Sequence, residues 1–232
     1  MSIRQIKKEL RAYADPEKKA FYPRFFKTGK GEYGEGDRFL GVTVPLTRKV
    51  AKSHKDASWA VLEALVASPW HEERLLGFLI LIQRFEKGDE SAQKVTYQFV
   101  HKHRRYINNW DLVDAVAPKI IGPWYQSRSR RQLAQWVKSK NLWERRIAVM
   151  ATFPYIKEGD FKDILAFSQQ LLKDQEDLIH KAVGWMLREM GKVKSAELYK
   201  FLDQHAHKMP RTMLRYSLEK VPSPKKRQYM NQ

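Results

Sequence analysis

The chain has 232 residues, which is enough for one large domain or two small ones with a well-buried core. It contains 44 Lys and Arg against 26 Asp and Glu, a formal charge of +18, and 43% of its residues are hydrophobic, which excludes a disordered chain. It has no Cys, which excludes disulfides, a thiolate nucleophile and Cys-ligated zinc. No apolar run reaches the length of a membrane span, and the N-terminus lacks the apolar segment of a signal peptide. We therefore expect a cytoplasmic protein whose basic surface binds a polyanion, for which nucleic acid is the usual candidate.

The hydrophobic pattern is helical along the whole chain. Apolar residues recur every three or four positions, and connections of two to seven residues are typical of stacked antiparallel helices. Asp15 followed by Pro16 predicts a helix start, the four glycines within residues 28–38 predict a loop, and Pro118 predicts a kink or boundary. In chain order the predicted helices cover residues 3–10, 15–27, 45–54, 58–68, 71–87, 90–106, 109–121, 129–139, 142–155, 160–173, 175–192, 196–208 and 210–220.

Four tryptophans suggest an internal repeat. Trp70, Trp110, Trp143 and Trp185 are separated by 40, 33 and 42 residues, which is near the period of two-helix HEAT and armadillo repeats. Such repeats stack into a curved solenoid. We expect an all-α fold, a HEAT-like α-solenoid of antiparallel helix pairs with a concave basic face; an irregular helical bundle is the alternative. The solenoid is expected to cover residues 1–222 as one domain, followed by a basic, poorly ordered tail over residues 223–232.

The sharpest local feature is the segment Asn-Asn-Trp-Asp-Leu-Val-Asp over residues 108–114. On a helix, Trp110 and Asp114 share a face. Asp111 falls in the first turn, where a carboxylate caps backbone amides, and we favour that role for it. For Asp114 the spacing leaves two roles open, an ion-paired surface carboxylate and a functional one.

Two further segments place cations beside tryptophan. Trp143 is followed by Arg145 and Arg146, one of which can point to the concave face, with an inter-repeat salt bridge as the alternative. Later in the chain, spacings of four, three and four predict one helical stripe of three cations and one indole. A core-facing stripe would be apolar, so this one is expected to face solvent or a nucleic-acid backbone. The stripe consists of Lys181, Trp185, Arg188 and Lys192.

No motif for a metal or nucleotide site is present. The seven His include two pairs at i,i+2, and such pairs point to different sides of a helix. There is no HExxH, Walker A loop, GxSxG or dinucleotide-binding glycine pattern. We therefore expect no metal and no nucleotide cofactor.

Together these segments resemble the AlkD-like DNA alkylation repair glycosylases, a family built of HEAT-like repeats. The similar segments follow the family's order from about residue 15 to residue 190. The resemblance implies an enzyme that removes N3- and N7-alkylated purines from DNA. It rests on Phe39-Leu40-Gly41-Val42 with Pro45 and Arg48, on Trp110-Asp111-x-Val113-Asp114, on Asn141-Leu142-Trp143-x-x-Arg146, and on Lys181-Ala182-x-Gly184-Trp185-x-Leu187-Arg188-Glu189.

The resemblance also implies residue roles. The second aspartate of the Trp-Asp-x-x-Asp segment is the family's catalytic carboxylate, which is Asp114 here. The tryptophans against the damaged nucleotide are Trp110 and Trp185, and the arginine that holds the DNA backbone is Arg146. Where family members often carry a Tyr near the end of the second helix, this chain has Phe25. The other residues expected to bind DNA are Lys181, Arg188, Lys192, Arg48 and Arg145.

The implied partner is double-stranded DNA containing alkylated purines. A purine alkylated at N3 or N7 is cationic and already a good leaving group, so one carboxylate can suffice where glycoside hydrolysis usually needs two. Asp114 would stabilise the positive charge that develops on the sugar. We expect a monomer with no membrane attachment and no obligate protein partner. The alternative function is a non-enzymatic HEAT-like module that binds nucleic acid, whereas the charge disfavours a protein–protein scaffold.

Overall fold

The computed structural model describes residues 2–231, and within them the chain is helical throughout. The one β contact recorded in this range is an isolated parallel bridge between Arg38 and Trp70. The predicted all-α fold is therefore confirmed. Across residues 2–231, no helix combines the length and the apolar character that a membrane span requires. The chain divides into two compact units, Met1–Ile120 and Ile121–Gln232.

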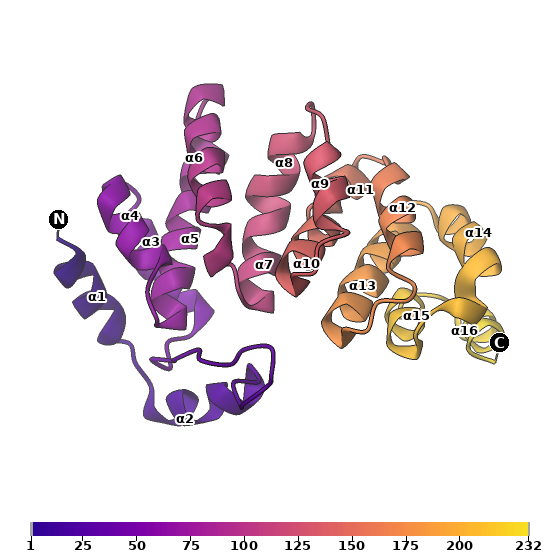
Figure 1. Cartoon of the computed structure of the whole chain (residues 1–232), viewed down its shortest axis with the longest axis horizontal. Helices are drawn as coiled ribbons and strands as arrows, with labels where there is room; N and C mark the ends of the chain where they lie inside the picture. The colour runs from indigo at the N-terminus through magenta and orange to yellow at the C-terminus, as the bar shows by residue number, and fades with distance from the viewer. Residues whose placement is uncertain (1, 232) are drawn as a thin grey trace. The chain divides into compact units, whose positions relative to one another are not determined.

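Unit 1 is organised around one long apolar helix. Residues 75–82 of this helix, α5, are buried, as the apolar run predicts, and α3, α4, α6 and α7 pack against it. Figure 1 shows α2 and the loop after it at one end of the other helices of this unit. The elements are α1 (Ile3–Arg11), α2 (Pro16–Phe25), α3 (Val44–Ser53), α4 (Trp59–Val66), α5 (His71–Lys87), α6 (Glu90–Lys102), the 3-10 turn η1 (Arg104–Tyr106), α7 (Trp110–Val116) and the π-helical turn η2 (Ala117–Ile121).

The glycine-rich segment of unit 1 is fixed to the start of α5. The buried Glu72 side chain accepts the three backbone N–H groups of residues 40–42, at 2.9, 2.8 and 3.1 Å. The His71 N–H donates to the Arg38 carbonyl at 2.8 Å. Gly41 has a φ of +87°, a left-handed conformation that favours glycine. Hydrogen bonds to α5 thus fix the backbone of the segment that leads into α3.

Unit 2 is organised around a second long helix, α13. Its Gly184 lies so close to α15 that a Cβ atom there would be 2.5 Å from the Met213 carbonyl oxygen. The absence of a side chain at Gly184 therefore allows the two helices to approach closely. The elements are α8 (Gly122–Tyr125), α9 (Arg131–Trp136), α10 (Leu142–Met150), α11 (Phe153–Lys157), α12 (Lys162–Gln170), α13 (Asp177–Val193), α14 (Ser195–His205), the 3-10 turn η3 (Ala206–Lys208), α15 (Arg211–Ser217) and α16 (Ser223–Met230).

Several helix boundaries differ from the prediction. The helix predicted over residues 142–155 ends at Met150, and α11 starts separately at Phe153, because Pro154 has no N–H to continue the ladder. The predicted kink at Pro118 falls in the π-helical turn η2, which continues α7. The short helix α8 was not predicted. The fourth tryptophan also breaks the repeat: Trp70, Trp110 and Trp143 lie at helix starts, whereas Trp185 lies in the middle of α13.

The C-terminal segment, for which a basic tail was predicted, forms the helix α16 over Ser223–Met230. In α16 the Tyr229 side chain is only 1% exposed, and its hydroxyl donates to Asp203 at 2.6 Å. Lys225 lies over the Tyr199 ring at 3.5 Å. Although the segment is basic in composition, its one buried aromatic residue, Tyr229, holds the helix against α14. The expectation of a single domain over residues 1–222 stays a prediction.

Candidate functional site

The predicted tryptophan–aspartate pair lies on the short helix α7. The Asn109 side chain caps this helix by accepting the Trp110 N–H at 2.8 Å. Leu112 and Val113 are fully buried and fix one side of the helix in the core. Trp110 and Asp114, one turn apart, are both half-buried. The helix therefore holds an indole and a carboxylate side by side at the boundary between core and solvent.

An aromatic cluster surrounds Trp110. The Phe26 ring stacks on the indole with centroids 5.3 Å apart and an interplanar angle of 18°. The Phe25 ring lies edge-on to it at 5.7 Å and 70°. Phe25 is 48% exposed, although it is aromatic. One face of Trp110 is thus occupied by Phe26, and an exposed ring lies beside it at the position where the resemblance placed a Tyr.

A buried ionic network lies beneath this cluster. The His71 ring has a carboxylate at each nitrogen: Nδ1 is 3.1 Å from Asp37, and Nε2 is 2.8 Å from Asp111. Arg74 pairs with the other oxygen of Asp37, and the Asn109 amide donates to Asp37 at 3.1 Å. The network therefore joins the glycine-rich loop, the first turn of α5 and the first turn of α7.

The network keeps the His71 ring protonated. Burial alone would lower the pKa of His71, but the charge of Asp111 and the hydrogen bonds that the ring donates to both carboxylates outweigh burial and raise the pKa to about 9. Burial would likewise raise the pKa of Asp37, but the hydrogen bond from His71 and the charge of Arg74 lower it. Two cations and two carboxylates thus compensate one another inside unit 1.

Asp111 has a larger role than the predicted cap. One of its oxygens accepts the Leu112 N–H at 2.9 Å, as a first-turn carboxylate would. Its other oxygen is the partner of His71, and the N-cap position itself belongs to Asn109. Asp111 therefore accepts a backbone N–H, as predicted, and in addition pairs with His71, which was not predicted.

In unit 2, the two predicted site residues make contacts within the protein. Arg146 is 4% exposed and donates to the Leu178 carbonyl at 2.5 Å, so it joins α10 to the first turn of α13. Trp185 is half-buried, and its Nε1–H donates to Glu189 at 3.2 Å. The Arg188 guanidinium lies 6.0 Å from the centre of the Trp185 ring. The indole is thus held by a carboxylate at its edge and accompanied by a cation.

Four of the five other cations predicted to bind DNA have carboxylate partners, and the fifth, Arg48, is exposed on α3. Among their carboxylate partners, Glu189 binds the largest number of side chains. Burial would raise the pKa of Glu189, but the hydrogen bond from Lys192 and the charge of Lys192 lower it. The four pairs are Lys181 with Asp177 at 2.7 Å, Arg188 with Glu219, Lys192 with Glu189 at 2.7 Å, and Arg145 with Asp174 at 2.7 Å.

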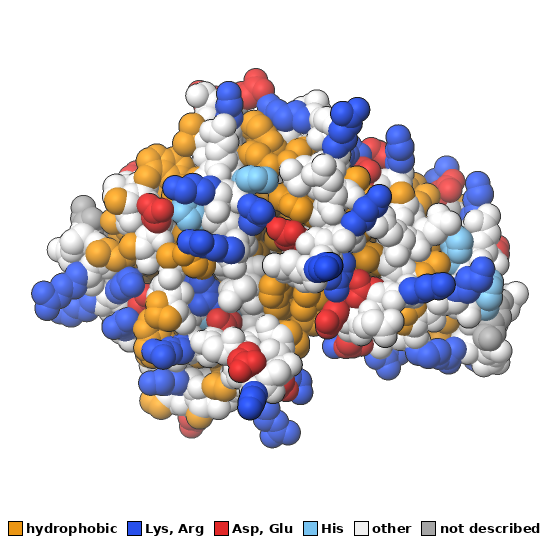
Figure 2. Space-filling model, in the orientation of Figure 1, with side chains coloured by type: hydrophobic (Ala, Val, Ile, Leu, Met, Phe, Trp, Pro, Cys, Tyr) orange, Lys and Arg blue, Asp and Glu red, His pale blue; other side chains and the backbone are white. Residues whose placement is uncertain are grey.

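The predicted site residues are divided between the two units. Trp110 and Asp114 belong to unit 1, whereas Arg146 and Trp185 belong to unit 2, so their convergence on one nucleotide stays a prediction. On the face drawn in Figure 2, Lys and Arg side chains are scattered over both units and are not gathered in one stripe. The concave basic face likewise stays a prediction.

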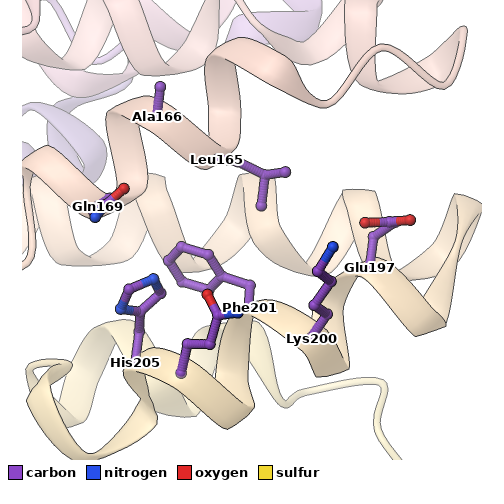
Figure 3. A pocket seen from close by; sticks show the side chains of 8 residues that line it. Leu165, Ala166, Gln169, Glu197, Lys200, Phe201 and His205 are labelled. Atoms are coloured by element: carbon purple, nitrogen blue, oxygen red, sulfur yellow. The ribbon is translucent and has the colours of Figure 1, made fainter.

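Two cavities lie in unit 2. A groove of about 310 Å³ separates α12 from α14, where Phe201 and His205 face Leu165 and Gln169 (Figure 3). No predicted site residue lines this groove. A smaller cavity of about 100 Å³ is lined by Arg188 and Lys192 together with Gly191, Ser195, Leu198, Tyr199, Ser217, Lys220 and Val221.

The sequence analysis missed the residues beneath Trp110. Asp37 lies in the glycine-rich loop, and His71 and Arg74 lie in the first turn of α5. One signal was available: the charged segment at residues 71–74 runs directly into the apolar segment at residues 75–82, so part of it had to be buried. The pairing partners lie 34 and 40 residues away in sequence, and no spacing rule connects them.

The fold and site define an all-helical protein with a half-buried Trp–Asp pair on a capped helix. Residues 6–221 match the model of the family described as DNA alkylation repair enzyme. The chain belongs to this family. A solved structure described as a predicted DNA alkylation repair enzyme from Enterococcus faecalis is similar over 90% of this chain and 97% of that chain, with 18% identity and a TM-score of 0.69. This likeness shows the all-α helical repeat fold. No curated protein matches the chain significantly.

Proposed function

We propose that this member of the DNA alkylation repair enzyme family is a DNA glycosylase for cationic N3- and N7-alkylated purines. The observation that carries the proposal is the half-buried Asp114 carboxylate one helical turn from the Trp110 indole, on a helix fixed at its start by a buried ionic network. In this proposal Trp110 and Trp185 pack against the damaged nucleotide, and Asp114 faces its sugar.

The chemistry needs only one carboxylate. As the C1′–N9 bond breaks, its electron pair moves to the purine and neutralises the charge that alkylation placed there. Positive charge then develops on the sugar, where Asp114 stabilises it. Water adds to C1′ and gives up a proton, which leaves a neutral free base and an abasic site. The indole faces add cation–π attraction to the developing charge, worth roughly 0.5–2 kcal/mol per contact.

Binding in this proposal is mainly electrostatic. The formal charge of +18 supports a duplex DNA partner. Each Lys or Arg that neutralises a phosphate contributes about 0.9 to the slope of log K against log salt. Arg48 and the cations of α13 contact the backbone. Because Arg146 is buried and donates to Leu178, its proposed hold on the DNA backbone acts mainly through the first turn of α13.

The experiment is release of free base by the full chain. A duplex containing 7-methylguanine is incubated with excess protein and a metal chelator, and the free base and abasic sites are quantified. The proposal expects equal yields of 7-methylguanine and of abasic sites that hot alkali cleaves. The control is the same duplex without the methyl group, from which no base is released.

The competing function makes a different prediction in the same assay. A nucleic-acid-binding module would bind the methylated duplex with the salt dependence described above and release no base. Salt-dependent binding without release, for both 7-methylguanine and 3-methyladenine duplexes, would therefore reject the glycosylase and leave the binding module.

A further inference from the structure

The geometry around His71 is unusual for a buried histidine. Its two ring nitrogens each face a carboxylate oxygen, at 3.1 Å from Asp37 and 2.8 Å from Asp111. A neutral imidazole has one N–H and one bare nitrogen, so it would present a lone pair to one of these carboxylates. The imidazolium donates to both. The arrangement of acceptors, taken by itself, therefore requires the charged ring.

The charged ring connects three segments of unit 1 that lie far apart in the sequence. Asp37 belongs to the glycine-rich loop, His71 to α5 and Asp111 to α7. The His71 ring also contacts two aromatic rings, Phe39 at 4.9 Å and 28° and Phe26 at 4.9 Å and 40°. Phe26 in turn stacks on Trp110. His71 thus reaches α7 by two routes, through Asp111 to its backbone and through Phe26 to its indole.

We propose that His71 is a positioning residue of the candidate site: as an imidazolium bridging Asp37 and Asp111, it sets the orientation of α7 and thereby of Trp110 and Asp114. This inference rests on the proposed function for its effect on catalysis. His71 is nearly fully buried, so it acts on the substrate only through α7.

The charges that face His71 come from four elements. Asp37 in the loop and Asp111 on α7 favour the protonated ring, and Arg74 on its own helix opposes it. On α2, burial and the charges of Glu72 and Asp111 raise the pKa of Tyr22, so Tyr22 stays neutral over the range in which His71 titrates. Loss of the His71 proton, which occurs near pH 9, leaves one excess negative charge in a closed site. The carboxylate of Asp111 or of Asp37 then faces a bare ring nitrogen, and the link to α7 or to the loop is lost.

The experiment compares excision rates under single turnover. His71→Gln replaces the imidazolium with a neutral group that cannot donate in two opposite directions, and we expect the rate to fall by about tenfold or more with little change in DNA affinity. In the wild type, the rate should fall as pH rises through about 9, whereas the His71→Gln rate should lack that step. The double variant His71→Gln/Asp111→Asn should regain part of the rate lost in either single variant, because it removes the unpaired buried charge.

The matched control is His54→Gln. His54 is a buried histidine of the same unit that pairs with Glu9 at 2.6 Å, far along the chain from α7. It should keep the wild-type rate and the pH step. A His71→Gln variant with the wild-type rate and pH profile would overturn the proposal. So would a loss of rate that follows the unfolded fraction of each variant.

A second readout does not depend on activity. The indole N–H resonance of Trp110, assigned with Trp110→Phe, should shift with pH through one step near 9 in the wild type and in His54→Gln, and not in His71→Gln. If the wild type releases no base, the proposed function fails while this titration still judges the positioning role. An indole resonance that shows no step near pH 9 in the wild type would overturn the positioning role, whatever the activity.

Discussion

The two long helices of the chain, α5 in unit 1 and α13 in unit 2, differ in where they place their polar residues and in what those residues bind. Each is a 17-residue helix at the centre of its unit. The first turn of α5 places four consecutive polar residues in the interior, His71 to Arg74, and each binds a segment outside the helix. In α13 one charged residue, Glu189, is buried, and it binds Lys192 and Trp185 of the same helix, which stay partly exposed.

The difference follows from the kind of segment that packs against each helix. The neighbours of α13 are helices that satisfy their own backbone groups, so apolar contact and a glycine suffice. The first turn of α5 also faces an irregular loop whose N–H and C=O groups need partners, and Glu72 and His71 supply them. Buried charge in unit 1 therefore orders the loop and α7, whereas the buried charge of α13, Glu189, pairs with cations that reach solvent.

The largest expected contrast is between Glu72→Gln and Glu189→Gln. Glu72 accepts three buried N–H groups, and bonds to a charged group contribute roughly 1.5–3 kcal/mol each, so Glu72→Gln should cost about 3 kcal/mol or more of unfolding free energy. Glu189 is also buried, but its partners Lys157 and Lys192 are partly exposed and can turn to water, so Glu189→Gln should cost less, about 1–2 kcal/mol. Urea unfolding followed by circular dichroism measures both. Equal losses would contradict the contrast.

The second prediction concerns pH. The pKa of His71 is raised from 6.5 to about 9 in the folded chain, so its contribution to stability is complete below about 6.5 and is lost as pH rises through about 9. The full contribution is roughly 3 kcal/mol, from 1.36 kcal/mol per pH unit. The difference in unfolding free energy between wild type and His71→Gln should shrink over this interval. A difference that stays constant from acid to alkaline pH would contradict the charged ring.

The third prediction tests the close approach in unit 2. In Gly184→Ala the new Cβ would lie 2.5 Å from a backbone oxygen of α15, which cannot move alone, so overpacking should cost about 1–3 kcal/mol. Gly191→Ala on the same helix meets only the Leu198 side chain, which can turn away, and it gains helix propensity. Thermal unfolding should place Gly191→Ala near the wild type. If both variants unfold at the same temperature, below that of the wild type, the close contact with the α15 backbone is not the cause of the lost stability.

The smallest effect concerns α16. Tyr229→Phe removes the hydrogen bond to Asp203 and should cost about 1–2 kcal/mol, since the acceptor is charged. Burial and this bond also raise the pKa of the Tyr229 hydroxyl, so it stays neutral and keeps donating in mildly alkaline solution. Gln228→Ala, exposed on the same helix, is the control and should change little. If Tyr229→Phe were as stable as the wild type, the bond to Asp203 would not hold α16 in place, and the tail predicted from composition would be the better description.

Local patterns predicted the parts of the chain that local forces determine. The apolar period predicted α5 and its core residues. The segment from Asn109 to Asp114 predicted a capped helix, and the Trp–Asp spacing predicted two site residues on one face of it. The His71 network was not predicted, because its bonds depend on which distant segments of the chain meet. In the sequence its members are ordinary polar residues. Arg146 was predicted to touch DNA, and only burial could reveal its bond to Leu178.

The most direct measurement compares Asp114→Asn with Asp56→Asn in single-turnover release of 7-methylguanine. Asp114→Asn removes a charge and nearly preserves shape, so it should keep the fold and DNA affinity while excision slows by about 10²–10³, the cost of losing one preorganised electrostatic group. Asp56 is an exposed aspartate of the same unit, and Asp56→Asn makes the same change of charge without touching α7. The account predicts a slow Asp114→Asn variant beside an Asp56→Asn variant at the wild-type rate. Excision by Asp114→Asn at the wild-type rate would contradict it.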